Sequence, residues 1–136
     1  MQVHVLVPQS LQSTLQLMSL SLSQLAGVEQ RSMQVDGQAC DVYTLLLEDG
    51  KGHEFNIGGQ SFGLWSEKGA PLLTVPIWLG AMLLPSIRLH LERHESRGVM
   101  MYLYFQSRLS RAIPVSIPLF GKIYLATGRL SEGVGS

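Results

Sequence analysis

The segment HLERHE contains the residues of this chain whose spacing comes nearest to a metal site. His90, Glu92 and His94 occupy alternate positions, so on a strand their side chains would point to one face. On a helix the two histidines would lie one turn apart. The glutamate does not directly follow the first histidine, as it does in the common zinc hydrolase helix, and the interleaved arginines favour a solvated hairpin. We therefore expect no bound metal or other cofactor here.

Other catalytic patterns are missing from the sequence. Cys40 is the single cysteine, and no nearby cation is expected to lower its pKa. The run GKGHEFNIGG matches no phosphate-binding loop, and no GxSxG nucleophile motif occurs. We therefore lean against an enzyme, and keep a metal-dependent enzyme that uses HLERHE as the least favoured alternative.

The composition indicates that part of the apolar surface is covered by something. Hydrophobic residues make up 46% of the 136-residue chain and charged residues only 15%, below the roughly 25% charged residues typical of soluble domains. Residues 1–86 have three basic and seven acidic side chains (−4), whereas residues 87–136 have seven basic and three acidic ones (+4). The arginines are scattered, so nucleic acid is not an expected partner.

Residues 70–87, APLLTVPIWLGAMLLPSI, form a run of eighteen positions without charge. Three interpretations of this run are open: a buried core segment, an exposed docking or membrane-interface element, and a membrane-spanning helix. Because prolines and a glycine interrupt the run, the spanning helix is the least favoured of the three. A wholly buried segment would have to hide unpaired backbone groups, and we therefore expect part of it at the surface. The partner-binding residues predicted from this argument are Leu72, Leu73, Val75, Ile77 and Trp78.

The elements that position these residues are predicted to form a small α+β domain with a mainly antiparallel sheet. Residues 1–8 alternate as a first strand, with Val3, Val5 and Val7 on one face. Leucines and one methionine recur at helical spacing from Leu11 to Leu25, which predicts one amphipathic N-terminal helix over about residues 10–26. The domain is expected to span residues 1–130, with residues 131–136 as a flexible tail.

Two hairpins are predicted. The first would pair residues 42–47 with residues 54–57 through the turn at 48–52. The second would pair residues 86–93 with residues 99–107, with Val99, Met101, Leu103 and Phe105 facing inward. Pro114 and Pro118 favour an edge strand or an irregular extension, followed by a short strand over residues 122–126.

Together these patterns predict a non-enzymatic accessory or assembly subunit, which docks through an apolar surface onto a larger protein complex. A membrane-bound complex is one option for this partner. The expected partner is a protein, with a lipid headgroup layer as runner-up and a second copy of the chain as a further option. An alternative is a domain that binds a small apolar ligand in a pocket lined by Met82, Leu83, Met100 and Met101. The lack of a secretion signal predicts a cytoplasmic protein, with a location at the periphery of a membrane as a further option. In the cytoplasm Cys40 is expected to stay reduced.

Overall fold

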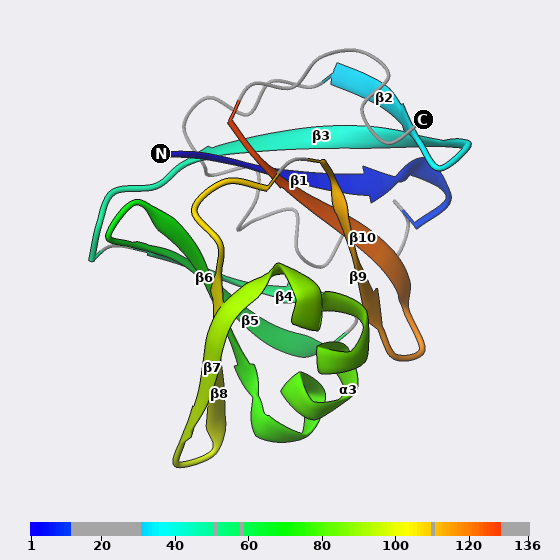
Figure 1. The fold of residues 1–136 in the computed structure, drawn as a ribbon. Coiled ribbons are helices and arrows are strands. Elements are labelled where there is room, and N and C mark those ends of the chain that lie inside the picture. The colour runs from blue at the N-terminus through cyan, green and yellow to red at the C-terminus, as the bar shows by residue number, and fades with distance from the viewer. Residues whose placement is uncertain (12–30, 51, 58, 110, 129–136) are drawn as a thin grey trace.

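The described residues form two antiparallel five-stranded sheets (Figure 1). The computed structural model describes residues 1–11, 31–50, 52–57, 59–109 and 111–128. The first sheet has the strand order β2-β3-β1-β10-β9, and the second has the order β4-β5-β6-β8-β7. The elements are β1 (Gln2–Pro8), η1 (Gln9–Leu11), β2 (Arg31–Val35), β3 (Gln38–Leu46), β4 (Gly52–Ile57), β5 (Gln60–Glu67), β6 (Ala70–Pro76), α3 (Ile77–Ile87), η3 (Arg88–His90), β7 (Leu91–Arg97), β8 (Met100–Phe105), β9 (Ile113–Ile117) and β10 (Gly121–Thr127).

The two sheets and α3 share one hydrophobic core. It includes Val3, Val5 and Val7 of β1, so the face predicted from their alternation is confirmed. The helix α3 contacts β9 of the first sheet and β6 and β8 of the second, and it thereby joins the two sheets at one end (Figure 1). Because side chains alternate along a strand, the residues between these core positions face away from the shared core.

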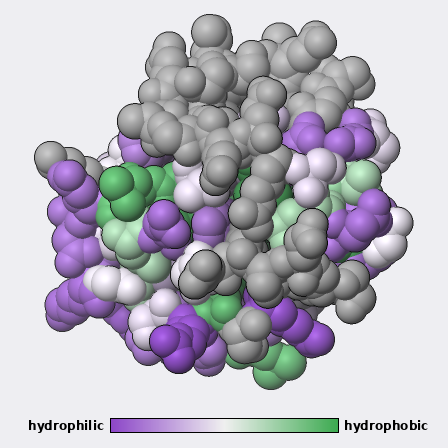
Figure 2. Space-filling model, turned by 90° about the horizontal axis from the view of Figure 1, so that it is seen from above, coloured by the Kyte–Doolittle hydropathy of each residue, from purple (hydrophilic) through white to green (hydrophobic). Residues whose placement is uncertain are grey.

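The outward face of the first sheet carries a second, smaller cluster of buried residues. Leu6, Cys40, Val42 and Tyr124 belong to it, and each is almost fully buried. Seen from above, on the side of β2 and β3, the described residues show hydrophobic groups separated by hydrophilic ones (Figure 2). The first sheet is therefore buried on both faces over much of its centre, which explains why β1 is apolar at nearly every position.

The predicted fold class was wrong. The described residues are mostly antiparallel strands, and their α-helix lies at Ile77–Ile87, in the middle of the sequence, between β6 and β7 of the second sheet. The N-terminal helix predicted for residues 10–26 falls mostly on residues 12–30, outside the described part of the chain, while Ser10 and Leu11 belong to the short 3-10 helix η1. The proposed tail at residues 131–136 also lies outside the described residues.

The first predicted hairpin was wrong as well. Strand β3 pairs with β1 and β2 in the first sheet, whereas β4 pairs with β5 in the second. The polar segment after β3 therefore crosses from one sheet to the other. Asp49 fixes this crossing, because its carboxylate accepts hydrogen bonds from the Ser66 hydroxyl at 2.7 Å and the Gly69 N–H at 3.3 Å.

The second predicted hairpin is confirmed only in part, because residues 86–90, predicted to be extended, belong to α3 and η3, and β7 runs over Leu91–Arg97. Strands β7 and β8 pair as expected, and Met101, Leu103 and Phe105 are buried in the core. The turn lies at residues 98–99 and leaves Val99 exposed, so its predicted inward position was wrong. The predicted edge strand and short last strand are confirmed as β9 and β10.

Candidate functional site

One face of α3 is exposed although it is apolar. The side chains of Ile77, Trp78 and Met82 are 39%, 50% and 55% exposed. The buried side consists of Leu79, Gly80, Leu83, Leu84 and Ile87. The exposed side, which we call the α3 face, consists of Ile77, Trp78, Ala81, Met82, Pro85 and Ser86. Since both sides are uncharged, this helix has no polar face toward solvent, unlike an ordinary surface helix.

Packing against the second sheet holds the α3 face rigidly. Gly80 lets the helix approach β8 so closely that a Cβ at this position would lie 2.9 Å from the Cβ of Met101. The backbone N–H of Ile77 donates a 2.8 Å hydrogen bond to the carbonyl of Val99. This bond fixes the tip of the β7–β8 hairpin beside the first turn of the helix.

Two further exposed apolar side chains flank α3. Val99, at the hairpin tip, is 76% exposed, and Leu89, in the 3-10 helix that follows α3, is 89% exposed. Solvent-exposed apolar residues are normal when they are single. Here they accompany a whole helical face, and contiguous apolar areas of this kind mark interaction sites.

The structure divides the five partner-binding residues predicted from the sequence. Leu72, Leu73 and Val75 lie on β6 and are buried, with exposed fractions of 7%, 2% and 0%. Ile77 and Trp78 lie on the α3 face. The exposed part of the predicted site therefore begins at the helix, and sequence reasoning missed Met82, Leu89 and Val99. The signal for Met82 was available, because the uncharged run continues to residue 87.

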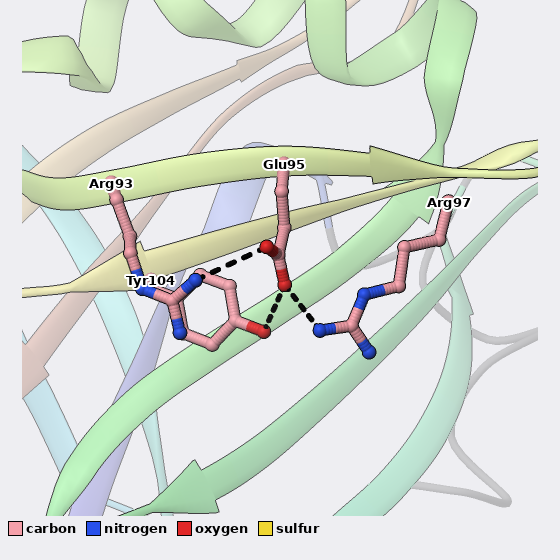
Figure 3. A network of polar contacts seen from close by, with 4 residues as sticks. All are labelled: Arg93, Glu95, Arg97 and Tyr104. Carbon is pink, nitrogen blue, oxygen red and sulfur yellow. Dashed lines mark hydrogen bonds and ion pairs between the residues drawn. The ribbon is translucent and has the colours of Figure 1, made fainter.

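A network of arginine, glutamate and tyrosine side chains lies on β7 and β8 next to this hairpin tip (Figure 3). Glu95 accepts hydrogen bonds from Tyr104 at 2.8 Å, from Arg93 at 3.1 Å and from Arg97. The Tyr104 hydroxyl, followed by Arg97, holds the pKa of the Glu95 carboxyl below its ordinary value. The guanidinium of Arg93 lies 3.8 Å from the centre of the Tyr104 ring, and that of Arg97 lies 4.8 Å from the centre of the Tyr102 ring.

This network orients Arg97, which directly precedes the hairpin tip. Stacking on Tyr102 and pairing with Glu95 restrict its rotamers, while its side chain remains 60% exposed. The sequence from residue 70 to residue 128 is basic, because it contains six basic residues and only two acidic ones, Glu92 and Glu95. Arg88 follows the last residue of α3 directly. In the sequence, positive charge therefore follows α3, whereas the segment before it has a net negative charge.

The predicted metal ligands are distributed over two elements. His90 ends η3, whereas Glu92 and His94 are exposed on β7. Among the residues that the structure describes, no group of three histidine, cysteine or acidic side chains is arranged to hold a metal ion.

The residues predicted to line a pocket for an apolar ligand are also separated. Leu83 and Met101 belong to the shared core, and Met82 lies on the α3 face. Met100 faces away from the core on β8, at the opposite pleat from Met101.

Cys40 is buried in the second hydrophobic cluster. Burial, and then the neighbouring carboxylates Asp41 and Asp36, raise the pKa of its thiol to about 11. A thiol with such a pKa is protonated at neutral pH and is a poor nucleophile.

No helix in the described part of the chain is both long enough and apolar enough to cross a membrane. Comparison with known proteins returned no matching family model, no matching curated protein and no matching solved structure.

Proposed function

We propose that this protein is a non-enzymatic docking subunit whose α3 face binds a partner protein. The observation that supports this proposal is a helix whose solvent side carries Ile77, Trp78 and Met82 and no charge. Covering such side chains removes apolar surface from water, at about 25 cal/mol per Å². Tryptophan and methionine are also enriched in protein interfaces.

The chemistry of the partner follows from the charges around the helix. Arg88 directly follows the last residue of α3, and Arg97 lies two residues before Val99, whose carbonyl is bonded to the first residue of α3. Arg97 is held in place by Glu95 and Tyr102. An ordered guanidinium can pair with a carboxylate in bidentate fashion at a small further cost in side-chain entropy. We therefore expect the partner to present an apolar patch bordered by aspartate or glutamate.

A protein is favoured over a lipid surface because α3 is not built as an interfacial helix. Helices that lie in a headgroup layer have lysine and arginine along a polar face that stays in water. In α3 the face opposite to the exposed one is packed in the core, and none of its eleven residues is charged.

Site-specific photo-crosslinking in the native host tests this proposal. A photoreactive residue is placed at position 78 or 82, and a matched one at position 119, where Leu119 is fully exposed in the turn between β9 and β10. We expect positions 78 and 82 to crosslink the same discrete protein, and position 119 not to crosslink it.

A second measurement checks that the crosslinked protein is bound through the apolar surface. Trp78→Glu and Met82→Glu should remove its co-purification, whereas Leu119→Glu should retain it, and all three variants should keep cooperative unfolding. Retention of the same partner by both α3 variants would refute the proposal. A crosslinked species with twice the mass of the chain would show that the α3 face binds a second copy of this chain and not a different protein.

A further inference from the structure

The outward face of the second sheet contains a groove, on a surface distinct from the α3 face. Its volume is about 400 Å³ and it is lined by Glu54, Asn56, Ser61, Phe62, Gly63, Thr74 and Met100. The strand register explains this grouping, because Glu54 lies opposite Gly63, Gly63 opposite Thr74, and Thr74 opposite Tyr102. Apart from Phe62, which also belongs to the shared core, the lining residues alternate along their strands with core residues such as Leu73 and Met101.

Two glycines beside the groove leave room for larger neighbouring side chains. At Gly63, an added Cβ would lie 2.3 Å from Oγ1 of Thr74 and 2.5 Å from Nε1 of Trp65, so only glycine fits without movement. The indole of Trp65 also covers Gly52, where an added Cβ would lie 2.3 Å from its Cδ2. The two glycines therefore let the indole lie close against the strands, next to the floor of the groove.

We propose that this groove binds a neutral, hydroxyl-rich ligand of the size of a sugar ring. The lining offers a carboxylate, a carboxamide and two hydroxyls, which together accept and donate hydrogen bonds as sugar hydroxyls require. The thioether of Met100 adds an apolar contact for the C–H groups of such a ring. A volume of about 400 Å³ is within the range of small-molecule sites.

Other ligand classes fit this lining poorly. No lysine, arginine or histidine is among the described residues that line the groove, and Glu54 would repel a phosphate or carboxylate. A purely apolar ligand would remove water from Glu54, Asn56 and the two hydroxyls without replacing their hydrogen bonds, which is costly.

Binding is tested by saturation-transfer NMR and calorimetry with neutral oligosaccharides built from glucose, galactose, mannose or N-acetylglucosamine. We expect saturable binding of at least one of them to the full chain. Glu54→Gln and Thr74→Val should each weaken it roughly tenfold, the value of one good hydrogen bond. Glu92→Gln, an exposed glutamate outside the groove, should leave the affinity unchanged.

Circular dichroism and the melting temperature establish that each variant is folded, and two results would overturn the proposal. One is the absence of saturable binding by every sugar, or binding that neither groove substitution weakens. The other is preferential binding of n-butylammonium that depends on Glu54, which would assign the groove to a cationic ligand. Because these variants leave α3 unchanged, a failure here does not affect the docking test above.

Discussion

Replacing Gly80 by alanine tests whether α3 packs against β8 as closely as the structure has it. In a helix interior, alanine is favoured over glycine by about 1 kcal/mol, so an unhindered Gly80→Ala change would stabilise the protein. The new Cβ would, however, lie 2.5 Å from Sδ and 2.9 Å from Cβ of Met101. The sulfur can move by rotation, whereas the Cβ moves only with the strand.

Overpacking of this kind costs about 1–3 kcal/mol, which exceeds or cancels the gain in helix propensity. We therefore expect Gly80→Ala to lower the free energy of unfolding by up to about 2 kcal/mol, measured by urea denaturation with circular dichroism. The neighbouring Ala81→Gly change is the matched control, because Ala81 is exposed on the α3 face. It should lower the free energy by about 1 kcal/mol through propensity alone.

A double-mutant cycle identifies the cause of the destabilisation. Met101→Ala removes the sulfur that the new Cβ would meet, so the cost of Gly80→Ala should be smaller in that background, with a coupling of at least about 0.5 kcal/mol. The reasoning would be refuted if Gly80→Ala stabilised the protein by the amount that Ala81→Gly destabilises it. In that case α3 would not lie against β8 as described, and the exposed face assigned to it would also be wrong.

Two further predictions concern titratable groups. Because the pKa of the Cys40 thiol is raised to about 11, a disulfide reagent at pH 8 should label the native protein far more slowly than the urea-unfolded chain, and fast native labelling would contradict its burial. The Ser66 hydroxyl, followed by the Gly69 N–H, holds the pKa of the Asp49 carboxyl below its ordinary value of 3.8. Asp49 therefore contributes stability that is present above this value and is lost as the pH falls toward the lowered pKa, so Ser66→Ala should reduce the acid-induced loss of unfolding free energy between about pH 4 and pH 2. An unchanged acid limb in that variant would show that the hydrogen bond to Asp49 does not contribute.

Local patterns in the sequence were sufficient for several strands and turns. Alternation predicted β1, β8 and the first three residues of β7. The prolines and the apolar residues of the segment 112–128 predicted β9 and β10. The dipeptide Asp36-Gly37 is a typical turn sequence that would also have predicted the hairpin of β2 and β3. Both of its residues have positive φ in the structure. Such strands and turns can be predicted because their backbone conformation depends on steric contacts between residues close in sequence.

The partners of the strands depended on the tertiary structure. Alternation indicates that residues 42–47 and 54–57 are extended, but it does not say which strand lies beside each. Strand β3 pairs with β1, where the partners Leu6 and Val42 are 36 positions apart in the sequence, and β4 pairs with the strand that follows it. The stability of such pairings comes from cross-strand packing and burial, which no local window contains.

The same distinction applies to the candidate site. The sequence by itself determined that residues 70–87 are uncharged and that proline interrupts them. It could not show that α3 begins after Pro76, because residues on both sides of this helix are apolar and leave no helical period to detect. Only the packing of Gly80 and Leu83 against the sheets decided which side is buried, and thereby left Trp78 and Met82 exposed to solvent.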